Sequence, residues 1–394
     1  MLAPVSGPAT ARIAFATTHP GLEMILAREL AELNLTPRVM EPGAVEFEGD
    51  ERAVARANLG LRTASRITLR IAAFHAGSFH ELERHGARVP WQQFLAPGVK
   101  AHLRVSTSKS KLYHERAIIE RLTESVRSAC PNVEMVMARG EADQDERSAV
   151  ADLPIQRFVV RVHRDECVVS VDTSGPLLHR RGYRTDVAKA PLRETLAAGC
   201  LLAAGWDGST PLVDPMCGSG TIPIEAALIA RRIPPGLRRR FAFENWPLAD
   251  PEIIRQARAM FEAEIRDRAP APILGSDRDP GAIVAATANA VRAGVSGDID
   301  WRRGALSTMD PPSGPGWVVT NPPYGHRIGD RAPLRNLYAQ FGNVLRRQVP
   351  GWQVAMISAD RMLEGQAALA WHEQARTDNG GIRVRLVVAE VPKS

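Results

Sequence analysis

The sequence predicts an α/β fold. A C-terminal half built on a doubly wound, mostly parallel sheet is preceded by a smaller α+β half. From about residue 190, short apolar segments alternate with segments of helical periodicity, which is typical of parallel sheets with helices on both faces. Before residue 173, strands and helices follow a less regular order and end in a β-hairpin pattern. The stretch 173–190 lacks periodicity and is rich in Gly, Pro and basic residues, so we interpret it as a linker.

The N-terminal half divides into two parts. In residues 1–75 we expect strands at 12–17, 44–47 and 66–74, with helices at 21–33 and 51–59. In residues 76–172 we expect a strand at 100–107, a helix at 115–129, and strands at 157–163 and 166–171 joined by a tight turn at Arg164 and Asp165. Alternating apolar residues indicate the strands, and apolar residues three and four apart indicate the helices. The acidic stretch 141–148 is predicted to be a solvated loop.

The C-terminal half covers residues 191–394. Strands are expected at 211–213, 271–275, 317–320, 353–358 and 384–390, and helices at 222–232, 281–293 and 334–349. The stretch 233–251 is interpreted as an insertion between the first two strands.

Composition narrows the class of protein. The chain has 394 residues, of which 44% are hydrophobic, enough for two or three domains. It shows no apolar run long enough to cross a membrane and no secretory signal, so we expect a cytoplasmic protein. The four scattered cysteines form no C-x-x-C pair, which argues against disulfides and a bound metal. The net charge of +6 permits binding to a polyanion without proving it.

The first motif is a Gly-rich turn between a strand and a helix. It runs Asp-Pro-Met-Cys-Gly-Ser-Gly-Thr from Asp214 to Thr221. Gly218 and Gly220 let a ligand approach bare backbone at the carboxyl end of a strand, where ligands bind in such sheets. The Asp214 side chain can accept a hydrogen bond from an ammonium or hydroxyl group. Because no Lys follows the glycines, a P-loop for phosphate is disfavoured.

The second motif places a carboxylate after the next strand. Asp277 follows the strand at 271–275, and an acid at this point commonly holds a ribose hydroxyl pair. Asp279 is the alternative ribose ligand, or it begins the next helix as a cap.

The third motif is the turn Asn321-Pro322-Pro323-Tyr324-Gly325 after the strand at 317–320. Two prolines fix the backbone and leave carbonyl acceptors next to the Asn side-chain oxygen. A rigid pair of acceptors suits a flat amino group and a neighbouring aromatic ring suits a base, so the turn predicts chemistry on an exocyclic amine.

Together these motifs resemble the THUMP-domain family of class I RNA guanine-N2 methyltransferases. Two further stretches share the resemblance, His179-Arg180-Arg181-Gly182-Tyr183-Arg184 and Ser108-Lys109-Ser110-Lys111-Leu112-Tyr113-His114. The resemblance covers essentially the whole chain. It implies a ferredoxin-like region at 1–75, a THUMP RNA-binding domain at 76–172 and a methyltransferase domain at 191–394 that uses S-adenosyl-L-methionine.

The resemblance also implies roles. Asn321 and the Pro322 carbonyl would accept hydrogen bonds from the guanine N2 amine, and Tyr324 would stack on the base. The cofactor would contact Thr195, Asp214, Met216, Gly218, Ser219, Gly220, Thr221, Asp277 and Arg278. RNA phosphates would contact Lys109, Lys111, Arg116, Arg180, Arg181 and Arg184. The methyl group would pass directly in line, with Cys217 as a packing residue.

Some questions stay open. Ala305 stands where relatives often carry an Asp near the adenine amine, so either the backbone or Asp310 would recognise adenine. His326 stands where relatives often have Glu, and it contacts RNA or lies exposed at the rim. Ribosomal RNA is the favoured substrate, with tRNA as the alternative. A DNA adenine methyltransferase, a protein glutamine methyltransferase and an idle RNA-binding factor are the rival functions, and the oligomeric state is unknown.

Overall fold

The computed structural model describes residues 12–136, 155–184, 192–324 and 331–393. Its N-terminal half is one seven-stranded sheet in the order β2-β3-β1-β4-β7-β6-β5. The strands are β1 (Arg12–Thr17), β2 (Pro37–Glu41), β3 (Ala44–Gly49), β4 (Arg66–His75), β5 (Lys100–Ser108), β6 (Ile155–His163) and β7 (Glu166–Asp172). Its helices are α1 (Glu23–Glu32), α2 (Glu51–Gly60), α3 (Phe79–Gly86) and α4 (Glu115–Ala129).

Strand β4 joins the two predicted N-terminal parts. It pairs with β1 of the first part and with β7 of the second, antiparallel in both cases. The two parts therefore share one continuous sheet and one apolar core, and the boundary between residues 75 and 76 stays a prediction.

The C-terminal half contains the predicted doubly wound sheet, in the order β10-β9-β8-β11-β12-β14-β13. The first five strands of that order are parallel, and β14 runs antiparallel to both β12 and β13. The strands are β8 (Leu212–Asp214), β9 (Ile273–Asp277), β10 (Ile299–Arg303), β11 (Trp317–Thr320), β12 (Gln353–Ser358), β13 (His372–Asn379) and β14 (Ile382–Glu390). This confirms the predicted fold class.

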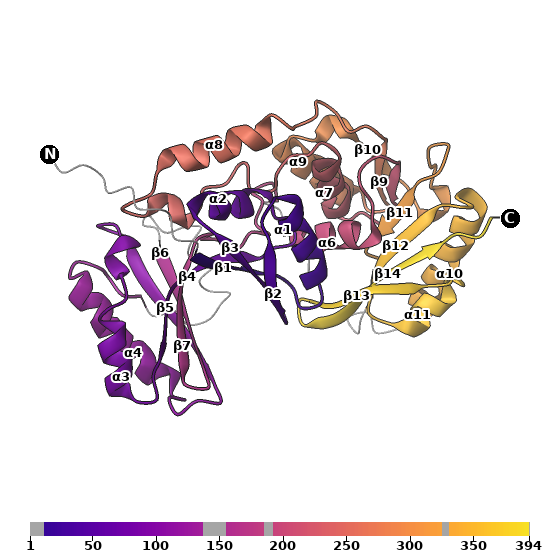
Figure 1. Cartoon of the computed structure of the whole chain (residues 1–394). Coiled ribbons are helices and arrows are strands. Elements are labelled where there is room, and N and C mark those ends of the chain that lie inside the picture. The colour runs from indigo at the N-terminus through magenta and orange to yellow at the C-terminus, as the bar shows by residue number, and fades with distance from the viewer. Residues whose placement is uncertain (1–11, 137–154, 185–191, 325–330, 394) are drawn as a thin grey trace.

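Helices cover both faces of this sheet (Figure 1). Apolar residues of α6 (Glu194–Ala204), α7 (Thr221–Ala230) and α9 (Pro280–Ala293) form the core on one face. Those of α10 (Arg331–Gln348) and α11 (Arg361–Gln366) form the core on the other. Because both faces are buried, the central parallel strands β11 and β12 are mostly apolar, whereas the edge strand β10 is mostly exposed.

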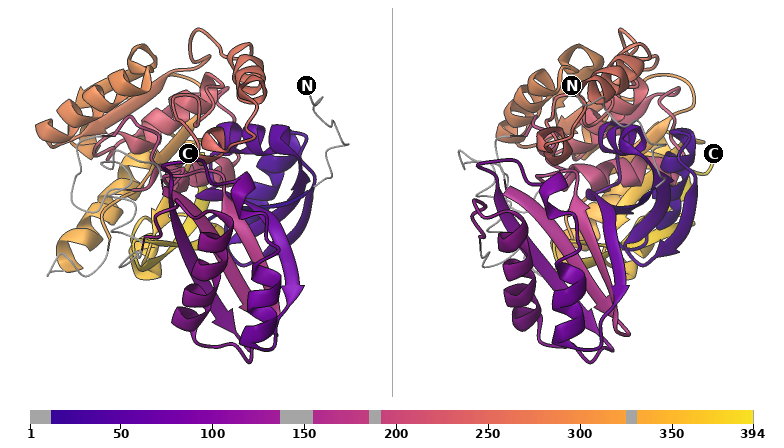
Figure 2. Two further views of the ribbon diagram at one scale, coloured as in Figure 1. Left: turned by 90° about the vertical axis from the view of Figure 1, so that its left-hand side faces the viewer. Right: turned by 60° about the vertical axis from the view of Figure 1, so that its left-hand side comes forward.

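The excess length between β8 and β9 includes a helix that the sequence interpretation missed. Helix α8 (Pro251–Glu262) begins at the cap Asp250 and buries Ile254 and Ala257. It packs on α2 of the N-terminal half, where a Cβ on Gly60 would lie 2.8 Å from the ring of Phe261. The insertion therefore connects the two halves, as Figure 2 also shows.

The described part of the predicted linker, residues 173–184, is packed between the two halves. The Arg239 guanidinium donates hydrogen bonds to the carbonyls of Leu177 and Arg180 at 2.6 and 2.7 Å. The Asn58 amide on α2 donates to the Thr173 hydroxyl at 2.8 Å. A basic, Gly-rich composition predicts a loose connection, but here the arginines act as internal hydrogen-bond donors.

The N-terminal half also docks directly on the C-terminal sheet. Leu22 and Ile25, at the start of α1, belong to the apolar core around α6. Gly21 has φ +95°, and a Cβ there would lie 1.7 Å from the Arg376 carbonyl oxygen of β13. Glycine is therefore required where the two halves meet.

Candidate active site

Three strands end next to one another at the carboxyl edge of the C-terminal sheet. Strand β8 lies between β9 and β11, so the chain leaves these strands at Asp214, Asp277 and Asn321 on one edge. The fold thus brings together the three motifs that the sequence singles out, at the usual ligand position of such sheets.

The Gly-rich turn is held against the end of β9 by backbone hydrogen bonds. The Cys217 N–H donates to the Ser276 carbonyl at 2.9 Å, and the Gly218 N–H donates to Asp277 Oδ2 at 2.9 Å. Asn289, a fully buried residue of α9, donates from Nδ2 to the Ser219 carbonyl at 3.0 Å. The turn therefore has a fixed shape before any ligand binds.

The two glycines of this turn have different surroundings. Both have positive φ, +52° at Gly218 and +82° at Gly220. A Cβ on Gly220 would lie 2.6 Å from the Trp301 ring and 2.9 Å from the Ala286 Cβ, whereas a Cβ on Gly218 would meet nothing within 4 Å. Gly220 is thus needed for packing, while Gly218 borders open space that a ligand can fill.

Asp214 is a buried carboxylate at the end of β8. It is 1% exposed and accepts a hydrogen bond from the Met216 N–H at 3.1 Å. The pKa of Asp214 is raised to about 7, mainly by burial, and the nearby Asp277 charge acts in the same direction. A buried carboxylate of this kind gains stability when a cation or hydroxyl reaches it.

Thr195 of α6 is also suited to bind a polar group of a ligand. It is fully buried, and its hydroxyl oxygen has no hydrogen-bond partner among the described residues. Met216 and Ser219 are half-buried and Thr221 is buried in the first turn of α7, while Arg278 is exposed.

The sequence left open whether Asp277 or Asp279 is the ribose ligand and whether Asp279 caps the next helix; the two residues have different surroundings. Asp279 is the N-cap of α9, accepting a hydrogen bond from the Gly281 N–H at 2.8 Å. Asp277 accepts one backbone hydrogen bond on each oxygen, from Gly218 and from Asp279, and each oxygen keeps a lone pair for another donor. Asp277 therefore remains the better candidate for a ribose ligand.

The Asn-Pro-Pro-Tyr turn presents an unused acceptor. Asn321 Oδ1 is buried and has no hydrogen-bond partner within the described ranges. Pro322 is buried beside it, and the Tyr338 hydroxyl donates to the Pro323 carbonyl at 3.5 Å. A buried acceptor without a partner is costly, so this atom marks a place for a donor from a ligand. The fit supports the predicted amine site.

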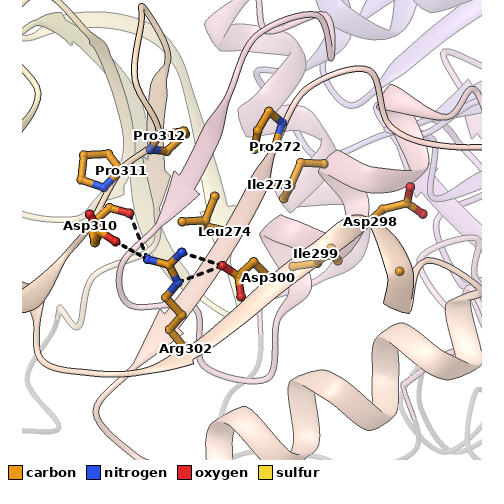
Figure 3. Close-up of a pocket in the computed structure, with 11 residues that line it drawn as sticks. Pro272, Ile273, Leu274, Asp298, Ile299, Asp300, Arg302, Asp310, Pro311 and Pro312 are labelled. Carbon is orange, nitrogen blue, oxygen red and sulfur yellow. Dashed lines mark hydrogen bonds and ion pairs between the residues drawn. The ribbon is translucent and has the colours of Figure 1, made fainter.

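The remaining adenine alternative, Asp310, is engaged elsewhere. It forms an ion pair of 2.8 Å with Arg302, which also pairs with Asp300 at 2.7 Å. All three residues line a cavity of about 430 Å³ beside Pro272 and Ile273, at the start of β9 (Figure 3). Asp310 is therefore already paired with a cation of β10, and recognition of adenine by the backbone or by Asp310 stays a prediction.

The six predicted RNA contacts fall into two groups. Lys109, Lys111 and Arg116 are exposed on the N-terminal half. Arg181 is interior, with a 3% exposed side chain that lies 3.5 Å from the carboxylate of the fully buried Glu225. Its prediction as a phosphate contact is therefore wrong.

Arg184 has a 12% exposed side chain that pairs with Glu194 at 3.4 Å and donates to the Leu192 carbonyl at 2.7 Å, so it too holds the chain together. Arg180 is half-buried. Gly325 and His326 lie outside the described residues.

The sheet order, the Gly-rich turn and the acids after β8 and β9 define a class I methyltransferase that uses S-adenosyl-L-methionine. The family comparison agrees: the description "RMKL-like, methyltransferase domain" matches residues 181–387, and the RlmL ferredoxin-like domain matches residues 14–68. The chain belongs to this RMKL-like methyltransferase family, and the predicted ferredoxin-like character of its first part is confirmed.

Relatives in other organisms cover the chain almost completely. A Synechocystis protein, provisionally named an RNA methyltransferase, is 33% identical over 97% of this chain and 98% of its own length. A protein of Syntrophotalea carbinolica named ribosomal RNA large subunit methyltransferase K/L is 35% identical over 95% of this chain. The chain spans about half the length of the K/L relatives, 53% in this case.

Solved structures show the same architecture. A methyltransferase complexed with S-adenosylhomocysteine superposes with a TM-score of 0.83 at 28% identity, covering 98% of both chains. A Listeria monocytogenes protein described as a predicted N6-adenine-specific DNA methylase gives 0.83 at 31% identity, covering 98% of this chain and 97% of its own. S-adenosyl-L-methionine is thus the cofactor of this enzyme.

Other features carry less information about function. Within the described ranges, no group of three or more His, Cys, Asp or Glu side chains is arranged to hold a metal ion. No helix in that part of the chain is long and apolar enough to span a membrane. All four cysteines are buried and free, and Cys217, within the Gly-rich turn, is 7% exposed.

Proposed function

We propose that the protein transfers a methyl group from S-adenosyl-L-methionine to the exocyclic N2 amine of a guanosine in RNA, with 23S ribosomal RNA as the substrate. The names of the K/L relatives and the ferredoxin-like match in the N-terminal half support an RNA substrate. The choice of guanine N2 rests on the resemblance of the motifs to guanine-N2 methyltransferases. A cytoplasmic location goes with this proposal and stays a prediction.

The observation that carries the proposal is the buried, unpartnered Oδ1 of Asn321. It lies at the end of β11, the strand next to β8 and its Asp214. An amine whose hydrogens are held by Asn321 Oδ1 and the Pro322 carbonyl has its lone pair oriented for attack. These acceptors also stabilise the positive charge that develops on the nitrogen.

Other residues at the carboxyl edge of the C-terminal sheet would hold the cofactor and the base. Asp214 and Thr195 would hold the amino acid end of the cofactor, Asp277 its ribose hydroxyls, and Tyr324 would stack on the base. The bound cofactor supplies an activated methyl group, so the protein contributes mainly position and orientation. The guanine must be unpaired or turned out of its helix to reach this edge, at a cost of a few kcal/mol.

The proposal is tested with purified protein, labelled cofactor and RNA that lacks the modification. Methyl transfer should yield N2-methylguanosine, and Asn321→Ala should lower kcat by at least about 100-fold, the loss typical for removal of a preorganised transition-state contact. Asn343→Ala, which truncates an exposed asparagine on α10, is the matched control. Near wild-type turnover by a folded Asn321→Ala protein would contradict the assignment.

DNA is the rival substrate, since the Listeria relative is described as a DNA methylase. The same assay with duplex and single-stranded DNA decides between them. Formation of N6-methyladenine in DNA without any product in RNA would replace our proposal.

A further inference from the structure

The loop between β5 and α4 presents an exposed aromatic pair. Tyr113 is 66% exposed, the only tyrosine among the large exposed apolar residues of the described chain. Its ring centroid lies 4.1 Å from that of His114, at an interplanar angle of 43°. Tyr183 and Tyr338 are 3% and 1% exposed, and Tyr324 is half-buried against the core around α6. Among the described tyrosines, Tyr113 is therefore the one whose ring is mostly open to solvent.

This loop has a fixed conformation. Leu112 anchors it in the apolar core at 4% exposure. The Lys111 N–H donates to Asp165 Oδ1 at 2.7 Å, and the Asp165 N–H donates to the Ser110 hydroxyl at 3.1 Å. The Thr107 hydroxyl donates to the Tyr113 carbonyl at 3.3 Å. The aromatic pair is thus presented by a rigid support, which lowers the entropy lost on binding.

Basic side chains lie in the same loop as the pair and in the turn that holds this loop. Lys109 and Lys111 precede it in the loop, and Arg164 lies in the β6–β7 turn that holds the loop. All three are exposed, and the Arg164 N–H donates to the Ser108 carbonyl at 3.3 Å. The nearest acid of the turn, Asp165, already accepts a backbone hydrogen bond from Lys111. An exposed aromatic ring among cations is the combination that binds single-stranded nucleic acid, by stacking on bases and attraction of phosphates.

We propose that Tyr113 and His114 form a second RNA-binding site, which stacks an unpaired base of the substrate while Lys109, Lys111 and Arg164 contact its phosphates. This inference rests on the proposed function for the identity of the nucleic acid. The site is separate from the catalytic edge, because β7 runs from the turn at Asp165 to the connecting segment at Thr173. Seven strand residues span about 20 Å, so an RNA that reaches both sites extends well beyond the target base.

Binding by the full chain is measured by fluorescence anisotropy with two labelled probes, a 15-nucleotide oligoadenylate and a 15-base-pair RNA duplex. Tyr113→Ala should weaken oligoadenylate binding about 5- to 100-fold, the range measured for loss of one stacked base. Its effect on the duplex should be less than about twofold, since paired bases cannot stack on the ring. Tyr113→Phe should bind both probes as wild type does, because the phenyl ring still stacks.

Lys109→Ala and Lys111→Ala should weaken both probes and reduce the salt dependence of binding by about one phosphate contact each. Met40→Ala, a truncation of an exposed side chain on β2, is the matched control and should change neither. Unchanged oligoadenylate affinity in Tyr113→Ala would overturn the proposal, leaving the surface to another partner. Equal losses on both probes would also overturn it, because stacking would not then explain them.

A methylation assay separates this inference from the proposed function. If no guanosine is methylated but Tyr113→Ala still loses affinity for oligoadenylate, the second site stands and the proposed function fails. If guanosine is methylated and Tyr113→Ala binds oligoadenylate normally, the second site alone fails.

Discussion

The Asn379 side-chain amide donates a hydrogen bond of 2.7 Å to the hydroxyl of Tyr324. Asn379 ends β13, and the next two residues, Gly380 and Gly381, have φ of +61° and +85°. Two consecutive positive φ values define a tight hairpin turn, and the Asp378 carboxylate accepts the Gly381 N–H at 2.8 Å. A rigid hairpin of the methyltransferase sheet therefore fixes the ring proposed to stack on the target base.

The first prediction concerns this contact. Asn379→Ala should lower kcat/KM for RNA about 5- to 10-fold, because one hydrogen bond of about 1 kcal/mol no longer orients the ring. Tyr324→Phe should lose a similar amount, and the double variant should lose no more than either single variant. Cofactor affinity by calorimetry should stay unchanged in all three. Additive losses in the double variant would show that the two side chains act independently.

The second prediction separates the two glycines of the cofactor turn. Gly218→Ala should fold with a loss of only about 1–2 kcal/mol for its left-handed backbone, yet its methyl group should obstruct the cofactor and weaken binding at least about tenfold. Gly220→Ala should lose about 1–3 kcal/mol more stability, because its Cβ would overlap Trp301 and Ala286. Urea denaturation and calorimetry check both. Normal cofactor affinity in Gly218→Ala would place the ligand elsewhere.

The third prediction concerns pH. Burial raises the pKa of Asp214 to about 7, so in the free protein this group is largely protonated below pH 7. A cationic partner favours the carboxylate, so cofactor affinity should rise about tenfold per pH unit up to pH 7 and then level off. Asp214→Asn should bind the cofactor more weakly, and its affinity should lack the pH dependence that Asp214 causes in the wild type.

The raised pKa of Asp214 also affects the stability of the folded protein. A carboxyl with a raised folded-state pKa favours the folded protein less as pH rises from about 4 to 7. Asp214→Asn should therefore raise the melting temperature of the cofactor-free protein at pH 8, with less effect at pH 5. A variant that is equally destabilised at both pH values would show that the carboxylate has a purely structural role.

The fourth prediction concerns the buried pair of Arg181 and Glu225, whose side chains are 3% and 0% exposed. The Tyr183 hydroxyl also donates to Glu225, at 3.1 Å. Arg181→Ala should destabilise the protein by about 3–5 kcal/mol, because it removes a cation that pairs with a buried carboxylate. The exposed Arg116→Ala should lose less than about 1 kcal/mol. A loss below about 1 kcal/mol for Arg181→Ala would return that residue to the list of candidate RNA contacts.

Much of the fold could be predicted from periodicity. The strands Arg12–Thr17, Trp317–Thr320 and Gln353–Ser358 and the helix Glu115–Ala129 have the predicted bounds. In Arg12–Thr17 and in the helix, apolar residues recur at the spacing of one buried face. In the parallel strands they are nearly consecutive, because both faces of that sheet are buried. Periodicity missed strands β2, β10 and β13, because at least half of the residues in each are exposed and none of them carries a clear apolar pattern.

The candidate site was predictable where a short motif carries the chemistry, as at Asp214–Thr221 and at Asn321. Asn289 and Asn379 were missed, because their roles depend on packing between segments far apart in the chain. The charge of Arg181 and Arg184 suggested phosphate contacts, since sequence does not distinguish an arginine facing solvent from one facing a buried carboxylate. Glu225 lies one helical turn after Thr221 in the apolar helix that follows the motif. This acid is the one sequence signal that could have indicated an internal partner for Arg181.

The central claim is methylation of a guanosine amine in RNA, and nucleoside mass spectrometry of a deletion strain tests it most directly. Ribosomal RNA and tRNA are purified separately from the wild-type and deletion strains, and from deletion strains carrying the wild-type gene or Asn321→Ala. Our account predicts that N2-methylguanosine falls in 23S ribosomal RNA, returns with the wild-type gene and does not return with Asn321→Ala. Unchanged N2-methylguanosine in both RNA fractions, or loss of a different methylated nucleoside, would contradict it.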